Sequence, residues 1–412
     1  MTEATVASSA ASPVVSRPAP SPKPLPRGTP ALRAALYKQL AKAGPGSGAA
    51  VYDLTDGMSV FALRARVVRP PASVEKLYTS LAVLRDLGPS ATLQTKVVGA
   101  GYLGAGGVWH GNLYLVGGGD PTLGDGNFNR VWEEGYGPTA TQLAHQLQAA
   151  GIRSVSGHLI GDGSLFDHRR GPPSSDFAPD IGDLGGQLGG LTYDHGATTR
   201  NLPPGAFAAH ELALTLRARH VFVRASRAGG SPPAGARPLA TVSSPPMSVL
   251  LRLMDVPSDD FLAEMLTKQL GLRYGGGGTT ADGAQVISDA ISYYGLDPRI
   301  VDGSGLSRSD GSSPDQVIEL LRALNGSTTG AELYSSLPVV GVSGTVRTIA
   351  ANTPARRACV AKTGTLNGVT NLAGWCHARD GKLLAFALFI DGPPNWTALP
   401  LVSAMVTSIA RF

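Results

Sequence analysis

Cysteine is scarce in this chain of 412 residues, which contains only Cys359 and Cys376. The two form no CxxC motif and lie in no Cys/His cluster, so a structural zinc site is disfavoured. The eight histidines include no HExxH motif, and the glycine-rich segments include no helix-opening GxGxxG or Walker pattern. The sequence therefore predicts no metal site and no cofactor.

Charged residues are also few, at 16% of the chain, with 35 Lys and Arg against 30 Asp and Glu. Because no long basic run is present, binding to nucleic acid is disfavoured. The net charge of +5 is compatible with attraction to an anionic cell-envelope surface and equally with an ordinary solvated surface. Hydrophobic residues reach 42%, and 53 Gly with 31 Pro indicate a globular chain with many turns.

Long apolar runs are absent. No stretch of about 18 apolar residues occurs, so no segment is predicted to span a membrane. Residues 1–30 also lack the basic stretch followed by an apolar stretch that marks a secretory signal. Because these residues are rich in Pro, Ala and Ser, they are predicted to be a disordered leader.

Two periodicities predict the regular elements. Apolar residues recur at intervals of three and four, as in helices, over residues 31–40, 74–84, 248–256, 259–271, 282–295, 314–326 and 398–412. Apolar and polar residues alternate or run together, as in strands, over residues 49–63, 92–99, 111–118, 154–162, 220–226, 358–376 and 382–392.

The order of these elements predicts a divided chain. Residues 31–91 and 246–412 are expected to form one α/β (α+β) domain, in which helices flank an antiparallel sheet. Residues 92–245 are expected to form a β-rich insert with one or two helices, arranged as one unit or as two small subdomains.

Serine and lysine stand three residues apart at the start of one predicted helix, in Ser73-Val74-Glu75-Lys76. Residues at i and i+3 are neighbours on a helix, so the Lys76 amine can lie beside the Ser73 hydroxyl. A serine nucleophile needs a base, and lysine serves only where burial or positive charge favours its neutral form. Alone, the motif also fits a helix-capping serine and a surface lysine.

A second motif, Lys362-Thr363-Gly364-Thr365, lies in a predicted strand. Gly364 is expected to let a ligand backbone approach closely, so that a peptide can pair with the strand edge. Lys362, Thr363 and Thr365 could then hold a terminal carboxylate. A strand end followed by a turn explains this motif as well.

A third motif, Ser258-Asp259-Asp260, precedes a predicted helix and by itself fits helix capping. Together, the three motifs follow the order of the penicillin-recognising serine enzymes. The gap of about 180 residues between the Ser73 motif and the Ser258 motif resembles that of class C low-molecular-mass penicillin-binding proteins, the D-alanyl-D-alanine carboxypeptidase/endopeptidase family. Further similar stretches are PASVEKLYT, GGGDPTL, GDGSLFD, SDDFLAEML, VDGSGLSR, LPVVGVSGTVR and AKTGTLNGVTNLAGW.

The resemblance implies a serine transpeptidase/β-lactamase-like fold and acyl-enzyme chemistry without a metal or cofactor. The implied partners are peptidoglycan peptides ending in D-Ala-D-Ala and β-lactam antibiotics. Such an enzyme is expected to be extracytoplasmic, facing the periplasm or the cell wall, with its export signal or anchor absent from this sequence.

The resemblance also implies a role for each motif residue. The nucleophile is Ser73 and its base Lys76, while Ser258 relays a proton to the leaving amine and Lys362 supports the site electrostatically. Substrate contacts are implied for Asp260, Thr363, Gly364 and Thr365. The oxyanion hole is expected to use the backbone N–H groups of Ser73 and Thr365.

Asp260 departs from the family pattern, which usually has Asn at this position. Asn offers both donors and an acceptor, whereas an ionised Asp only accepts, and its charge favours the protonated form of Lys76. We therefore expect slowed peptidase turnover with penicillin acylation retained. Two alternatives stay open: a catalytically weakened homologue that binds peptidoglycan or acts as a scaffold, and a β-lactamase or esterase.

Two further groups of residues lie near the motifs. Cys359 and Cys376 flank the Lys362 hairpin, so a cross-strand disulfide is one hypothesis and two small buried residues are the other. Asp310 also stands where the family often has Asn. The segment interpreted as a structural turn near the site contains Asp302, Ser304, Ser307 and Asp310.

Overall fold

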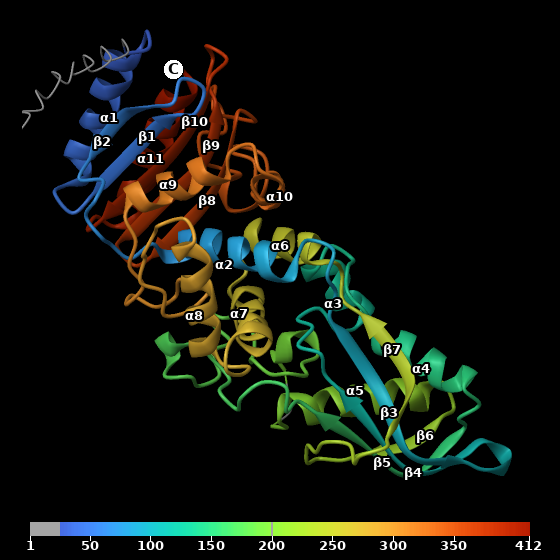
Figure 1. The fold of residues 1–412 in the computed structure, drawn as a ribbon. Coiled ribbons are helices and arrows are strands. Elements are labelled where there is room, and N and C mark those ends of the chain that lie inside the picture. The colour runs from blue at the N-terminus through green and yellow to red at the C-terminus, as the bar shows by residue number, and fades with distance from the viewer. Residues whose placement is uncertain (1–24, 199–200) are drawn as a thin grey trace, which may run out of the picture.

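The computed structural model describes residues 25–198 and 201–412. Residues 1–24 of the predicted leader lie outside the described residues, and its last residues enter helix α1 (Thr29–Ala43). The molecule is elongated, with one sheet toward each end and a layer of helices between them (Figure 1). In the described part of the chain, no helix combines the length and the apolar composition that crossing a membrane requires.

The first sheet has five strands in the order β2-β1-β10-β9-β8, and all neighbouring pairs are antiparallel. The two ends of the chain meet here, because β1 pairs with β10. The predicted antiparallel sheet flanked by helices is confirmed. Its strands are β1 (Gly48–Asp53), β2 (Met58–Leu63), β8 (Cys359–Leu366), β9 (Val369–His377) and β10 (Leu383–Asp391).

Alternate side chains of this sheet point into two separate cores, as the two-residue period of a strand requires. On β10, Phe386 and Leu388 face a core shared with α1 and α11 (Asn395–Ala410). Ala387 and Phe389 face the core formed by the remaining helices of this part. The sheet is therefore covered on both faces, and β8 is one of its edges.

The helical layer on the second face carries most of the candidate site. The predicted helix at residues 74–84 begins as a 3-10 turn, η1 (Ala72–Glu75), continues as α2 (Lys76–Ala82) and ends in a π-helical turn (Val83–Leu87). The other helices are α6 (Met247–Asp255), α7 (Asp260–Tyr274), α8 (Thr280–Ser292), α9 (Pro314–Leu324) and α10 (Thr328–Ser336).

The second sheet is mixed, with the order β6-β5-β4-β3-β7 and parallel pairing of β4 with β5 and of β5 with β6. Parallel neighbours need long crossovers, which contain α4 and α5. The expectation of one or two helices was therefore wrong, since the described residues form three. The elements are β3 (Gln94–Leu103), β4 (Val108–Val116), α3 (Gly126–Trp132), α4 (Ala140–Ala149), β5 (Ser154–Asp162), α5 (Pro204–Ala218), β6 (Phe222–Ala225) and β7 (Arg237–Ser243).

Residues 92–245, which contain the second sheet, are called the second-sheet part below. Two contacts attach this part to helix α7. The buried His195 ring stacks on Phe261 with centroids 4.2 Å apart, and its Nε2 lies 2.6 Å from Glu133 Oε1. Buried Lys268 donates to Asp167 Oδ1 at 2.5 Å. Because α7 begins at the third motif, these contacts help to hold that motif in place. The domain boundaries stay a prediction.

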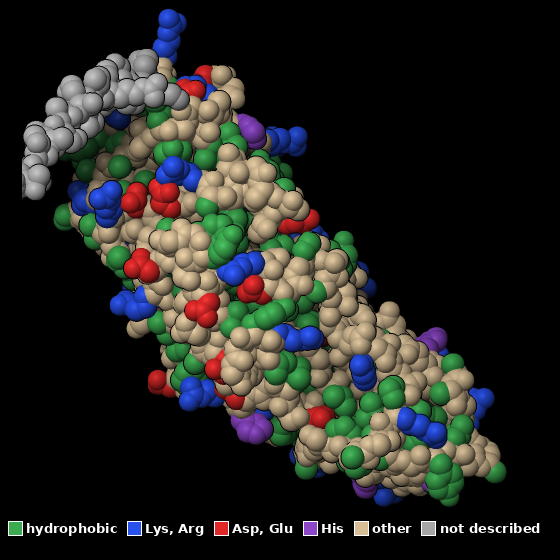
Figure 2. Space-filling view, in the orientation of Figure 1, with side chains coloured by type: hydrophobic (Ala, Val, Ile, Leu, Met, Phe, Trp, Pro, Cys, Tyr) green, Lys and Arg blue, Asp and Glu red, His purple; other side chains and the backbone are tan. Residues whose placement is uncertain are grey.

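Charge is dispersed on the surface drawn in Figure 2, where Lys and Arg side chains are interspersed with Asp and Glu. Apolar and neutral groups separate them. This face therefore carries no continuous basic patch, and the prediction about nucleic acid stays a prediction.

Candidate active site

The three sequence motifs meet at one pocket of about 420 Å³ beside the edge strand β8. Ser73 lies in the turn η1, Ser258 lies two residues before α7, and Asp260 is the first residue of that helix. All three line the pocket, together with Thr363 and Thr365 of β8. Residues separated by more than a hundred positions thus share one cavity.

Lys76 is the most enclosed group of the site, with 0% of its surface exposed. Its Nζ donates to Ser73 Oγ at 3.1 Å, to Asp260 Oδ1 at 2.5 Å and to the Ser304 carbonyl at 2.7 Å. An ammonium group has three donors, and all three find an acceptor here. The geometry therefore fits a protonated Lys76 that must give up its proton before it can act as a base.

Lys362 is a second buried amine in the same site. Its Nζ donates to Ser258 Oγ at 2.7 Å and to the Thr363 carbonyl at 3.3 Å. Burial, and then the charge of Lys76, lower the pKa of Lys362 to about 7. Near neutral pH, the Lys362 amine is therefore divided between its charged and neutral forms.

Asp255, at the end of α6, is a buried carboxyl whose charge acts on both lysines. Its Oδ2 accepts from Ser80 Oγ at 3.0 Å and from Ser336 Oγ at 2.7 Å. Burial raises its pKa to about 6, and the charge of Lys362 opposes that shift. The sequence signal that could have identified it is an acidic residue on the apolar face of its helix, four positions after Leu251.

Backbone conformations around Ser73 and Ser258 are unusual. Ala72 has φ 48° and Ser258 has φ 65°, although neither is glycine. Each left-handed residue of this kind costs roughly 1 kcal/mol or more, and such residues cluster at functional sites. A Cβ at Gly305 would meet the Ala72 carbonyl oxygen at 2.1 Å, so glycine is required where this loop passes the nucleophile.

Gly364 has a packing role that the sequence did not reveal, while its expected role in admitting a ligand backbone stays a prediction. A Cβ on this residue would lie 2.3 Å from the Pro71 carbonyl oxygen and 3.1 Å from Val74 N. Glycine is therefore needed so that β8 can pass the turn that carries Ser73.

Asn371 and Thr345 also belong to the site, although they were not identified from the sequence. Asn371 Nδ2 donates to the Pro70 and Pro71 carbonyls at 3.0 Å each, holding the segment before Ser73. Thr345 and Thr363 share a hydrogen bond of 2.8 Å between their hydroxyls. Both lie in stretches similar to the known family, and that similarity was the only available signal.

Glu264 orients the carbonyl that accepts from Lys76. Its buried Oε1 accepts from the backbone N–H groups of Gly303 at 3.0 Å and Ser304 at 2.9 Å. Burial, and then the nearby Asp302, raise the pKa of Glu264 to about 8. Because its position on α7 looks like part of an ordinary helix in the sequence, only the folded chain reveals this contact.

The turn that follows is built around Asp302 and Asp310. Asp302 accepts from the backbone N–H groups of Gly305 at 2.7 Å and Ser307 at 2.8 Å, and Asp310 accepts from Val301 N at 2.6 Å. Burial, and then Asp302, raise the pKa of Asp310 to about 9, and the two carboxyls hydrogen-bond. At neutral pH, Asp310 is thus protonated beside the Asp302 carboxyl.

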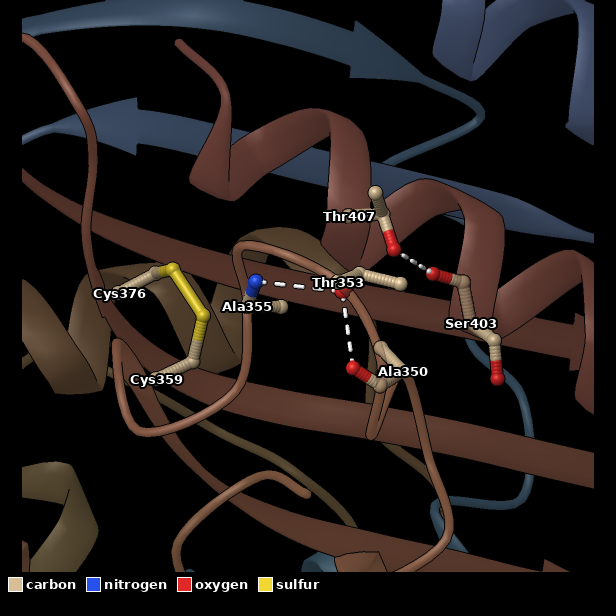
Figure 3. Close-up of a disulfide and its surroundings, with 7 residues drawn as sticks. All are labelled: Ala350, Thr353, Ala355, Cys359, Cys376, Ser403 and Thr407. Atoms are coloured by element: carbon tan, nitrogen blue, oxygen red, sulfur yellow. Dashed lines mark hydrogen bonds between the residues drawn. A yellow bond between two sulfur atoms is a disulfide. The ribbon is translucent and has the colours of Figure 1, made fainter.

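The two cysteines lie on the opposite face of the hairpin from Lys362. Cys359 and Cys376 are directly paired across β8 and β9 and are joined by a disulfide. The bond lies near the loop of Ala355 and near α11, which contains Ser403 and Thr407 (Figure 3). It therefore links the start of the Lys362 strand to its neighbour within the core shared with α11.

Comparison with known proteins identifies relatives over most of the chain. Residues 32–184 and 183–411 match the D-Ala-D-Ala carboxypeptidase 3 (S13) family. A D-alanyl-D-alanine carboxypeptidase of Actinomadura sp. (strain R39) is 27% identical over 92% of this chain and 84% of that protein. Carboxypeptidase DacB of Mycolicibacterium smegmatis is 30% identical over 87% of this chain and 79% of that protein.

Solved structures agree on the fold. Penicillin binding protein 4 (dacB) from Haemophilus influenzae superimposes with a TM-score of 0.76 at 19% identity, covering 92% of this chain and 99% of that one. With the match of nearly the whole described chain to the family, this likeness leads to one conclusion: the chain belongs to the D-Ala-D-Ala carboxypeptidase 3 (S13) family, as the resemblance to class C penicillin-binding proteins predicted.

Proposed function

We propose that this chain is a serine-type D-alanyl-D-alanine carboxypeptidase or endopeptidase that acts on peptidoglycan peptides through an acyl-enzyme on Ser73. The observation that carries the proposal is the 3.1 Å contact between Ser73 Oγ and the buried Lys76 Nζ, in a pocket shared with Ser258. Membership of the S13 family and the names of its carboxypeptidase relatives support the same activity.

The reaction starts when Lys76 is neutral. Its amine takes the Ser73 proton while Oγ bonds to the carbonyl carbon of the penultimate D-Ala. The C–N bond then breaks, and the departing D-Ala amine takes a proton relayed through Ser258. Water adds to the acyl carbon, Ser73 regains its proton, and the shortened peptide leaves as a carboxylic acid.

Two groups of hydrogen-bond donors support the acylation of Ser73 in this proposal. The backbone N–H groups of Ser73 and Thr365 stabilise the oxyanion of the tetrahedral intermediate. Thr363, Thr365 and the charged form of Lys362 hold the terminal carboxylate of the substrate. Asp260 fixes Lys76 rather than the substrate, because its carboxylate already accepts from that amine.

β-Lactams follow the same route as far as the acyl-enzyme. Opening of the lactam amide acylates Ser73, but the amine stays tethered to the acyl group and hinders the approach of water. A Haemophilus influenzae penicillin binding protein 4 structure of the same fold was solved with a bound β-lactam, which supports this part of the proposal. Because peptidoglycan lies outside the cytoplasmic membrane, the enzyme acts on that side.

A catalytically weakened homologue is the second candidate, and Asp260 is the observation that favours it. Its 2.5 Å contact with Lys76 stabilises the charged amine and opposes base catalysis. A β-lactamase or esterase is less favoured, because no residue of the described pocket is identified as a base for rapid deacylation.

Labelled penicillin tests the proposal directly. We expect one covalent adduct by intact mass, mapped to Ser73, together with release of D-alanine from an acyl-D-Ala-D-Ala peptide. The variant Ser73→Ala should lose both, whereas Ser335→Ala, an exposed serine of α10, should keep both. An adduct without D-alanine release would favour the weakened homologue, and rapid penicillin hydrolysis would favour the β-lactamase.

A further inference from the structure

The active-site pocket continues past the catalytic motifs to the start of helix α11. Trp396 and Leu399 line this end, and both are open to solvent, with 80% and 40% of their surfaces exposed. Ile349 and Val402 also line it but are almost fully buried, at 3% and 1% exposed. Asn395, which precedes Trp396, also lines the pocket, but its amide is bonded to the backbone of Leu366, Gly368 and Val369. The side chains that α11 offers a ligand at this end are thus mainly apolar, and we call this end the apolar recess.

Charge is sparse in the pocket lining. Among the described residues that line the pocket, Asp260 is the only charged one, and it is bound to Lys76. Thr365 and Thr370, which are paired across β8 and β9, lie in the pocket lining between the two ends and can offer methyl groups to a ligand. Exposed large apolar side chains beside a pocket are typical of binding surfaces, and the absence of charge favours an uncharged occupant.

We propose that this recess binds the side chain of the terminal, departing residue of the substrate, and that it prefers an apolar D-side chain larger than the methyl group of alanine. The inference rests on the proposed function. With the scissile carbon at Ser73 Oγ and the terminal carboxylate at Thr363 and Thr365, the Cα of the departing residue lies between them. A long side chain on that Cα reaches the Trp396 end of the same pocket.

The physical basis of the preference is desolvation. An apolar side chain placed against Trp396 and Leu399 removes apolar surface of both partners from water, which is favourable in proportion to the area buried. An ionised side chain would lose hydration there without gaining a partner, which is costly. The recess therefore selects for apolar departing residues and against charged ones.

Three peptides that differ only in the last residue test this preference: acyl-D-Ala-D-Ala, acyl-D-Ala-D-Leu and acyl-D-Ala-D-Lys. We expect kcat/KM for the D-Leu peptide to exceed that for D-Ala by roughly tenfold, the order of effect that extra methylenes have in an apolar pocket. The D-Lys peptide should fall below D-Ala. A D-Leu to D-Ala ratio of one or less would overturn the inference.

Variants of the recess sharpen the test. Trp396→Ala should bring the D-Leu to D-Ala ratio close to one, and Leu399→Glu should raise D-Lys relative to D-Leu. Trp132→Ala removes another exposed tryptophan from α3, in the second-sheet part, and should leave all ratios unchanged. If Trp396→Ala and Trp132→Ala change the ratio equally, the recess is not the cause.

The affinities of the three peptides distinguish a failure of this inference from a failure of the proposed function. In the Ser73→Ala protein, which cannot be acylated, the same three peptides can be compared by their Kd. A wild-type enzyme that turns over none of them contradicts the proposed function, yet tighter binding of the D-Leu peptide would still support the recess. Equal Kd values for D-Leu and D-Ala would overturn the recess even in an active enzyme.

Discussion

Two buried lysines serve the active site in different electrostatic surroundings. Lys76 contacts a carboxylate, Asp260, whereas Lys362 contacts a hydroxyl, Ser258. A carboxylate at 2.5 Å favours the ammonium form, while burial without such a partner favours the neutral form. Burial and the charge of Lys76 lower the pKa of Lys362. Only the folded chain reveals that the two amines have different hydrogen-bond partners.

The variant Asp260→Asn tests how much the Asp260 carboxylate slows the acylation of Ser73. We expect faster acylation of Ser73 by penicillin at neutral pH, because a neutral amide no longer stabilises the protonated Lys76. An electrostatic change of about 1.4 kcal/mol corresponds to about a tenfold rate increase. The second-order acylation rate, followed by intact mass, measures it. Asp315→Asn, outside the pocket, is the matched control, and an unchanged or lower rate in Asp260→Asn would contradict the argument.

The pH dependence of kcat/KM tests whether Lys362 binds the terminal carboxylate of the substrate. Its lowered pKa of about 7 means that the amine is charged below this pH and neutral above it. For acyl-D-Ala-D-Ala, kcat/KM should therefore fall above pH 7 relative to the same peptide with a terminal amide, which has no carboxylate to hold. Steady-state kinetics from pH 6 to 9 measure the ratio of the two peptides. A constant ratio would remove Lys362 from carboxylate binding.

At the scale of elements, the turn at residues 301–311 joins the site to a set of buried carboxyls. Glu264 and Asp302 accept from backbone N–H groups that orient the Ser304 carbonyl, and this carbonyl accepts from Lys76. Glu75, on the turn of the nucleophile, is also buried, and burial raises its pKa, with Asp310 adding to the shift. Burial thus favours the neutral form of several acids near Lys76.

Stability should decline as pH rises because of these acids. Their folded pKa values, about 8 for Glu264 and about 9 for Asp310, exceed the ordinary values near 4 of the unfolded chain. Between about pH 4 and 9, the folded state therefore binds more protons than the unfolded state, so the free energy of unfolding falls with rising pH.

Asp310→Asn tests this element. The amide can donate to Asp302 as the protonated acid does, but it cannot ionise. We expect the loss of stability between pH 6 and 8 to shrink by up to about 1.4 kcal/mol per pH unit. Urea unfolding at pH 6, 7 and 8 measures it, with exposed Asp289→Asn as the control. Parallel stability curves for Asp310→Asn and the wild type would refute the protonated pair.

At the scale of the whole molecule, the second-sheet part is attached where the site begins. The α7 helix carries Asp260 at its first residue and Lys268 two turns later, and Lys268 is bound to Asp167 of the second-sheet part. Burial lowers the pKa of Lys268, and Asp167 opposes this shift. The ion pair thus couples the position of the third motif to the docking of the remote part.

Asp167→Ala should destabilise the protein by roughly 3 kcal/mol, because it leaves the buried Lys268 without its partner. The double variant Asp167→Ala/Lys268→Met should recover much of this loss, since it removes the buried charge as well. Urea unfolding of both proteins measures the difference. A loss below about 0.5 kcal/mol in the single variant would show that water or another group already compensates Lys268.

Much of the fold follows from local patterns in the sequence. The apolar spacing over residues 314–326 predicts α9, and the alternation around Asp56-Gly57 predicts the β1–β2 hairpin, because burial of one face imposes these periods. The second-sheet part was predicted less well. Its strands β3, β4, β5 and β6 were predicted, but β7 was not. Parallel pairing depends on contacts between distant segments, and the number of helices was underestimated.

The sequence by itself determined the family and the motif residues Ser73, Ser258 and Lys362, because short chemical signatures keep their order along the chain. Only the tertiary structure decided how these residues act together. Hydrogen bonds and burial depend on which residues are neighbours in three dimensions. The different partners of the two lysines, the packing role of Gly364 and the apolar recess at Trp396 therefore required the folded chain, in which distant segments share one pocket.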